Sequence, residues 1–234
     1  MSLFTSMHVD CPNCGHTNTM EGVGSVNADR RPDLRDEIMA DTFQIEKCTE
    51  CGTEFRLQPE FNYFDMENGL WILALPATQL EDHIAQEDRT TALFNASYGP
   101  NAAPDVQEVG TALTCRLTFG WPAVREKILA RIEDLDDVVL EMMKLDLMRR
   151  LPQVYFNYGV ELRLLAVNDG GFEMAWLLTD SEEVQEVVRV GRELYDAILD
   201  QRADWAEVEA DLMCGGAFCD MQKLFLGAGR NAAE

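Results

Sequence analysis

CPNCG at residues 11–15 and CTECG at residues 48–52 are two copies of one short pattern, and they decide how the N-terminal part of the chain folds. In each copy two residues separate the cysteines, and a glycine follows the second one. This spacing lets a tight turn aim both sulfurs at one point, and the glycine can adopt the positive φ that such a turn favours. Two such turns supply four thiolates to one tetrahedral ion. The predicted metal ligands are Cys11, Cys14, Cys48 and Cys51.

Zinc is the expected metal, because four cysteine ligands around a tetrahedral ion are typical of structural zinc sites. Iron is the alternative, since four sulfurs also bind iron. A thioredoxin-like redox function is a third interpretation, but neither pair lies in the βαβ pattern of that fold. His16 stands beside the first pair, although four cysteines already complete the ligand set. Because four protein ligands leave no open position, we expect a structural rather than a catalytic site.

The residues around the second cysteine pair indicate a zinc ribbon. Residues 42–47 alternate in polarity and predict a strand that enters this pair, and residues 53–58 predict the strand that leaves it. The insert between the pairs, 33 residues long, contains a predicted helix at 31–40 with Pro32 in its first turn. A hairpin is expected at 61–76, where Asn68-Gly69 is a strong signal for a tight turn.

The remainder of the chain predicts helices and a further hairpin. Apolar residues at steps of three and four predict a long helix at 121–151, between Pro122 and Pro152, and a kink or break near Leu135 is left open. A hairpin is predicted at 160–179, followed by a helix and short closing helices. The buried face expected for the first of these helices consists of Val184, Val187, Val188, Leu194, Tyr195, Ile198 and Leu199. A helix at 78–97 and a strand at 110–120 complete the prediction.

Together these elements predict an α+β protein with an N-terminal zinc ribbon and β-hairpins, followed by a mixed hairpin and helical region. The zinc-ribbon and β-hairpin unit covers residues 1–76. The α+β region covers residues 77–234, and we expect it to pack against the first unit.

Charge and composition restrict the partners. The chain has 19 Lys or Arg against 42 Asp or Glu, a net charge of −23, which argues against nucleic acid or anionic lipid as a partner. The longest apolar stretch, residues 70–76, has the length of a strand, so no membrane span is predicted. Residues 1–10 lack the pattern of an export signal, and the seven cysteines are an odd number. These features predict a cytoplasmic protein with reduced thiols.

Other candidate sites have weaker patterns. Cys214 and Cys219 flank Gly215-Gly216 and are interpreted as a structural turn, and Cys115 as a core residue. The acidic pairs at 136–137 and 182–183 are interpreted as solvated helix faces. Because no catalytic motif is present, we expect a non-enzymatic interaction module with a protein partner. The alternative is an enzyme with its pocket in residues 78–226 and the ribbon as a structural brace.

The two cysteine pairs, followed by FNYFDMENGLWILALP at 61–76, resemble the CpXC domain family, a bacterial and archaeal group of uncharacterised activity. The resemblance extends through GWPAVREKI and LDDVVLEMMKLDL and covers about residues 9–150. Here the second pair lacks the proline after its first cysteine, which removes no ligand. The resemblance implies a zinc-ribbon-like N-terminal unit and supplies no catalytic residues.

Overall fold

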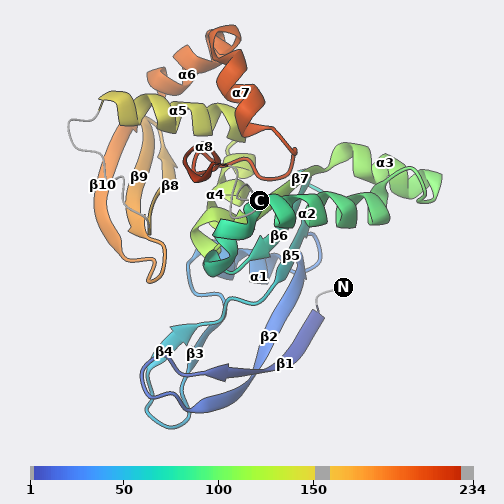
Figure 1. Ribbon diagram of the computed structural model, residues 1–234, viewed down its shortest axis with the longest axis vertical. Coiled ribbons are helices and arrows are strands. Elements are labelled where there is room, and N and C mark those ends of the chain that lie inside the picture. Colours follow the sequence, from blue (N-terminus) through green and yellow to red (C-terminus); the bar gives the residue numbers. More distant parts are fainter. Residues whose placement is uncertain (1–2, 151–158, 228–234) are drawn as a thin grey trace, which may run out of the picture.

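The computed structural model describes residues 3–150 and 159–227, and their helices and strands confirm the predicted α+β class (Figure 1). The strands are β1 (Leu3–Asp10), β2 (Thr17–Asn27), β3 (Ile45–Lys47), β4 (Glu54–Arg56), β5 (Phe61–Asp65), β6 (Leu70–Leu75), β7 (Thr114–Phe119), β8 (Val160–Asn168), β9 (Gly171–Leu178) and β10 (Val184–Gly191). The helices are α1 (Pro32–Met39), α2 (His83–Tyr98), α3 (Pro104–Ala112), α4 (Trp121–Ile132), α5 (Asp137–Arg150), α6 (Arg192–Asp200), α7 (Ala206–Leu212) and α8 (Lys223–Leu226), with 3₁₀ turns η1 (Ala77–Asp82) and η2 (Arg202–Trp205).

The largest sheet has the strand order β1-β2-β5-β6-β7. Strands β5 and β6 form the hairpin predicted at 61–76, and the Asp65 carboxylate orders its turn by accepting hydrogen bonds from the backbone N–H and side-chain amide of Asn68. Strand β7 pairs in parallel with β6. The sheet therefore takes strands from both sides of residue 76, the predicted boundary between units.

Strand β6 is buried on both faces, which explains its continuous apolar sequence LWILAL. Leu70, Ile72 and Ala74 face one apolar core, which α1 and α4 cover. The alternate residues of β6 face a second core, to which α2 and the buried residues Ala217 and Phe218 contribute. In the first core Phe43, Phe61 and Trp121 pack ring against ring, and the Trp121 indole donates a hydrogen bond to the Leu57 carbonyl.

The second sheet has the order β10-β9-β8. Strands β8 and β9 form the hairpin predicted at 160–179, with a two-residue turn between Asn168 and Gly171. Helices α5 and α6 cover one face of this sheet, where Met142, Met174 and Tyr195 belong to a third apolar core. Among the described residues no helix is long and apolar enough to cross a membrane.

The helix predicted at 121–151 is not continuous, because the chain divides it into α4 and α5 near Leu135, where the prediction left a kink or break open. Asp134 adopts the left-handed conformation with φ 52°, and the Leu135 N–H bonds back to the Ala130 carbonyl, which closes α4. The Asp136 carboxylate then accepts hydrogen bonds from the first N–H groups of α5. Asp136 therefore acts as the start signal of a new helix. Residue 151 lies outside the described residues.

The helix expected from residue 184 was also wrong, because residues Val184–Gly191 form strand β10 and the helix begins only at Arg192. Four valines in these eight residues favour the extended backbone, and β10 pairs with β9 along its length. Of the predicted buried face, Tyr195 and Ile198 are buried, but Val184, Val187 and Leu199 are 42–48% exposed. The two exposed valines follow from the position of β10 at a sheet edge.

A segment near the C-terminus, residues 213–222, connects the two sheets, and we call it the C-terminal strap. The Leu117 N–H of edge strand β7 donates to the Ala217 carbonyl, so the strap covers this edge. Gly215 and Gly216 have φ values of 83° and 90° and form the predicted turn. Cys214 is exposed at this turn, whereas Cys219 is buried.

Candidate metal centre

The two cysteine pairs lie in turns with the same backbone hydrogen bonds. In the turn between β1 and β2 the Cys11 N–H donates to the His16 carbonyl and the Gly15 N–H to the Cys11 carbonyl, both at 2.9 Å. In the turn between β3 and β4 the Cys48 N–H donates to the Thr53 carbonyl and the Gly52 N–H to the Cys48 carbonyl, again at 2.9 Å. Both glycines have positive φ, 72° and 73°, as the sequence predicted. One turn structure is thus used twice.

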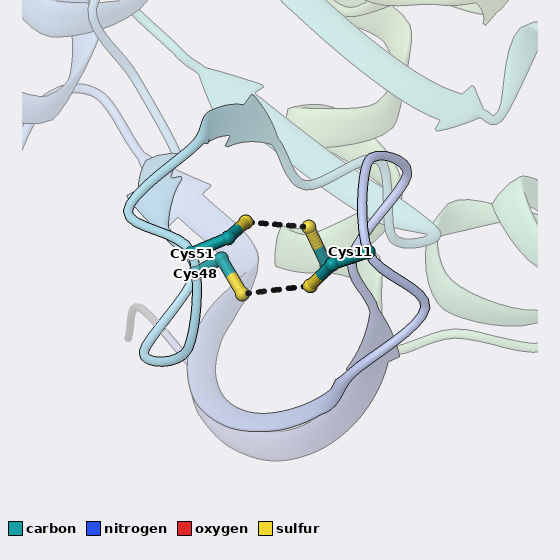
Figure 2. Close-up of side chains that lie close together, drawn as sticks. Cys11, Cys48 and Cys51 are labelled. Atoms are coloured by element: carbon teal, nitrogen blue, oxygen red, sulfur yellow. Dashed lines mark hydrogen bonds between the residues drawn. The ribbon is translucent and has the colours of Figure 1, made fainter.

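The four predicted sulfurs lie together between these turns (Figure 2). Cys11 Sγ is 3.6 Å from Cys51 Sγ, and Cys14 Sγ is 3.7 Å from Cys48 Sγ. All four sulfurs lie within 4.8 Å of one another. Metal–sulfur bonds of about 2.3 Å in a tetrahedron place the sulfurs about 3.8 Å apart, so the spacing fits one ion. The four cysteines could therefore hold a metal ion.

Strands β3 and β4 are the hairpin arms predicted at 42–47 and 53–58, although each is only three residues long. Their hairpin lies beside the turn that joins β1 and β2 (Figure 1). In each pair the first cysteine is buried and the second is exposed.

Three polar residues that the sequence did not indicate surround the sulfurs. Asn18 is 1% exposed; its amide donates to the His16 carbonyl and lies 3.7 Å from Cys48 Sγ, and its oxygen accepts from the Thr49 N–H and hydroxyl. Asn18 therefore joins the two turns.

The other two of these residues contact Cys51. The Asn13 amide lies 3.7 Å from Cys51 Sγ, and the Thr53 hydroxyl lies 3.2 Å from it. Asn13 lies between the two cysteines of the first pair, and Thr53 directly follows the glycine after the second pair. Their positions next to the predicted ligands could have indicated that they contact the sulfurs.

The thiols differ in how readily they lose their protons. The side chain and backbone of Thr53, helped by Asn13, lower the pKa of Cys51 to about 5. The Cys51 backbone N–H lowers the pKa of Cys48 despite its desolvation. The His16 backbone lowers the pKa of Cys14, but desolvation and the neighbouring thiols outweigh it and raise this pKa to about 12. The four thiols therefore do not lose their protons together, and a bound cation would be needed to keep all four ionised.

The remaining cysteines and His16 do not join this group. In the described part of the chain, one group of three or more His, Cys, Asp or Glu side chains could hold a metal ion, and it consists of these four cysteines. Cys115 is half-buried in β7 and Cys219 is fully buried, and burial raises the pKa of each to about 12. These raised values fit core positions.

A second group of polar residues, the buried charge cluster, lies where α4, α5, β7, β8 and the C-terminal strap meet. Each member is at most 6% exposed. The members are Arg116, Glu126, Lys127, Asp137, Glu141, Lys144, Glu161, Arg163 and Asp220. No sequence pattern indicated this group, and the interpretation of Asp137 as a solvated residue was wrong.

Ion pairs connect the buried charge cluster internally. Lys144 Nζ lies 2.5 Å from Glu126 and 3.0 Å from Glu141, and Arg163 lies 2.6 Å from both Glu161 and Asp220. Burial raises the pKa of Glu141 and Glu161 in spite of these cations. The cluster holds five carboxylates and four cations, so its carboxylates compete for too few cations.

A surface groove lies beside this cluster, with a volume of about 400 Å³. It is lined by polar residues that include Thr114, Arg116, Arg131, Asp137 and Tyr195. Arg116 and Asp137 bind each other there at 2.6 Å. The groove lies within residues 78–226, where the alternative enzyme hypothesis requires a pocket.

Comparisons with known proteins place the chain in a family. No curated protein and no solved structure matches it. The model of one family, described as CpXC protein, matches residues 9–144, more than half of the chain. The match includes both cysteine turns and α4, and it ends within α5, before β8 and the C-terminal strap. This agrees with the resemblance expected from the sequence, and the chain belongs to the CpXC family.

Proposed function

We propose that the chain binds one zinc ion through Cys11, Cys14, Cys48 and Cys51, and that this zinc is structural. The observation that carries the proposal is the spacing of the four sulfurs, which all lie within 4.8 Å of one another, with contacts of 3.6 and 3.7 Å between the turns. Four sulfur ligands complete a tetrahedron and leave no position for substrate or water. Zinc is preferred over iron because closed four-cysteine sites on paired turns are typical of structural zinc.

The zinc would stabilise a part of the chain that has few apolar contacts of its own. Strands β3 and β4 have three residues each, and none of these residues is buried. Structural zinc contributes apparent binding free energies of about 10–16 kcal/mol in finger peptides, which is enough to hold such a hairpin. Asn18, which contacts both turns, would orient the ligands from behind.

Elemental analysis of the purified full-length chain tests this proposal. We expect one zinc per chain and no visible absorption, whereas an iron–sulfur site would be coloured. Changing any of the four cysteines to serine should remove the metal, and Cys214→Ser, an exposed cysteine outside the centre, is the matched control. Iron at one equivalent would overturn the choice of zinc, and a full zinc content in Cys48→Ser would overturn the ligand set.

For the role of the chain, we propose a non-enzymatic module that binds a protein partner. A net charge of −23 favours a partner with a basic surface. Among the described strands β10 pairs only with β9, and this sheet edge exposes Val184 and Val187. A four-cysteine metal site needs reduced thiols, which favours a cytoplasmic location.

Crosslinking in cells with identification of the linked residues tests this role. We expect crosslinks from one partner to be concentrated at one surface and to decrease in a variant that changes that surface. Val187→Lys tests the β10 edge, and Arg30→Ala, which changes a residue remote from that edge in sequence, is the control. Crosslinks scattered over the molecule, with no loss in any surface variant, would contradict the role.

The second candidate function is an enzyme, which the groove lined by Arg116, Arg131, Asp137 and Tyr195 favours. Its volume of about 400 Å³ is that of a small-molecule site. Saturable binding of a small molecule that Arg131→Ala abolishes, while the fold persists, would support this candidate over the interaction module.

A further inference from the structure

The two cysteine turns expose their cysteines unequally, and in both turns the first cysteine is the buried one. Cys11 and Cys48, the first cysteine of each pair, are 3% exposed. Cys14 and Cys51, the second cysteine of each pair, are exposed. The sulfur of each exposed cysteine contacts the sulfur of the buried cysteine in the other turn, 3.6 Å for Cys51 to Cys11 and 3.7 Å for Cys14 to Cys48. The centre therefore contains two pairs of contacting sulfurs (Figure 2), and each pair joins an exposed cysteine to a buried one.

We propose that this centre is a site of oxidative modification by peroxide, at which disulfides form between the turns, Cys11 with Cys51 and Cys14 with Cys48, and the metal is released. The release of metal rests on the proposed zinc site. The choice of disulfide partners rests on the two sulfur contacts that each join an exposed cysteine of one turn to the buried cysteine of the other.

The chemistry requires one peroxide for each disulfide. The exposed Cys51 thiolate attacks one oxygen of hydrogen peroxide, the O–O bond breaks, and Cys51 becomes a sulfenic acid while hydroxide leaves and is protonated to water. The Cys11 thiolate then attacks the Cys51 sulfur, the S–S bond forms, and a second hydroxide leaves as water. Two thiolates, one peroxide and two protons thus give one disulfide and two waters. Cys14 and Cys48 react in the same way.

Pairing between the turns has a structural consequence that pairing within a turn lacks. The disulfides would join residues 40 and 34 positions apart, so they would replace the metal as the link between the hairpin β1–β2 and the hairpin β3–β4. Closing such long loops restricts the unfolded chain more than closing the short loop within a pair. Disulfides within a pair would leave the two hairpins unconnected. The oxidised protein should therefore keep its hairpins together without metal.

Peroxide titration of the full-length, metal-loaded chain tests the proposal. Metal release is followed with a coloured chelator, free thiols are alkylated, and the protein is digested with trypsin. Arg30 and Lys47 lie between the pairs, so Cys11 and Cys14 fall in one peptide and Cys48 and Cys51 in another. Disulfides between the turns join the two peptides, and disulfides within a pair leave them separate.

We expect four of the seven thiols to be lost as one metal is released, with the two peptides joined and fragmentation placing the bonds at Cys11–Cys51 and Cys14–Cys48. Separate peptides with disulfides inside each pair would overturn the proposal. Oxidation of Cys214 while the metal is retained would overturn it too. If the purified chain holds no metal, the proposed zinc site fails, and the peptide map of the reduced chain still decides the pairing.

Two double variants sharpen the result. Cys14→Ser with Cys48→Ser leaves Cys11 and Cys51, one buried and one exposed sulfur 3.6 Å apart. Cys14→Ser with Cys51→Ser leaves Cys11 and Cys48, which are both buried. We expect the first variant to form its disulfide about tenfold faster at the same peroxide concentration, because thiol oxidation follows exposure. Equal rates would contradict the proposal, and the map of the unaltered chain remains decisive if either variant fails to fold.

Discussion

The metal centre and the buried charge cluster both gather charged groups, but they balance that charge from different sources. The cluster neutralises most of its five carboxylates with Arg116, Lys127, Lys144 and Arg163, which belong to the same chain. The four sulfurs would take their positive charge from an ion in solution. The first region can therefore fold with its own residues, whereas the proposed site would make the second depend on metal supply and on the redox state of its thiols. The following predictions test this contrast, beginning with the largest expected effect.

Removing the metal should have the largest effect, and it should be confined to the ribbon. In the Cys48→Ser variant, or after chelation, we expect bound zinc to be lost and residues 9–18 and 45–56 to exchange their amide hydrogens freely. Zinc contributes about 10–16 kcal/mol in finger peptides, so the short hairpin cannot persist without it. Amide hydrogen exchange followed by mass spectrometry measures this. Residues 121–150 should stay protected, and global unfolding on chelation would show that the two regions are not independent.

Removing one cation from the buried charge cluster should destabilise the whole fold. Lys144 Nζ lies 2.5 Å from Glu126 and 3.0 Å from Glu141, and both carboxylates are fully buried. Lys144→Met removes this cation from both of them. Breaking a buried pair on one side costs about 3–5 kcal/mol, which urea denaturation can measure. The control is Arg150→Ala, since Arg150 pairs with Asp146 but is 65% exposed, and we expect a change of about 0.5 kcal/mol or less. Similar losses of unfolding free energy in Lys144→Met and Arg150→Ala would show that the buried ion pairs matter no more than an exposed one.

The cluster should also make stability depend on pH in the acid range. Burial raises the pKa of Asp220, but Arg163 and Lys144 lower it more, to about 2. Because the folded pKa lies below the ordinary 3.8, the stabilisation is complete above that value and is lost as the pH falls towards 2.

We expect a loss on the order of 2 kcal/mol over this interval, measured as the difference between the unaltered chain and Asp220→Asn. Glu141 and Glu161 have raised pKa values and the opposite sign, so their contribution decreases as the pH rises. The difference curve reports Asp220 together with its effect on Glu141 and Glu161, whose pKa values the Asp220 charge helps to raise. A flat curve would contradict this prediction.

The smallest predicted effect concerns Asn18, which supports the metal ligands from behind. Asn18→Ala removes the contact with Cys48 and the hydrogen bonds to Thr49, so we expect about tenfold weaker zinc binding in competition with a chelator. Asn13→Ala removes a contact at an exposed position and should weaken binding less. A larger loss in Asn13→Ala than in Asn18→Ala would reverse our assignment of their roles.

Local patterns predicted local structure in this chain. The C-x-x-C-G spacing predicted two turns with positive-φ glycines, and Asn68-Gly69 predicted the β5–β6 hairpin, because each signal lies within a few residues of the structure that it specifies. The division into α4 and α5 was anticipated only as an open alternative near Leu135, since Asp134 and Asp136 act through backbone geometry that leaves the apolar spacing intact. In β10 the valines follow helical spacing, but the pairing with β9 decides the structure.

The buried charge cluster could not be predicted from the sequence, because its partners are far apart along the chain. Arg163 and Asp220 are 57 residues apart, and Met221 donates its N–H to Glu141 over 80 residues. Read alone, each of these charged residues is typical of a solvated surface. Only the packing of α4 and α5 against β8 and the C-terminal strap brings them together and excludes water.

The C-terminal strap also sets the order in which the molecule can be completed during its synthesis. The ribbon cysteines and the β5–β6 hairpin emerge from the ribosome early, and they can form contacts over short stretches of chain. Strand β7 keeps an unpaired edge, and Arg163 lacks Asp220, until residues 217–220 have been made. The core therefore cannot close before the C-terminal strap has been synthesised, and until then the nascent chain presents an open sheet edge to which chaperones can bind.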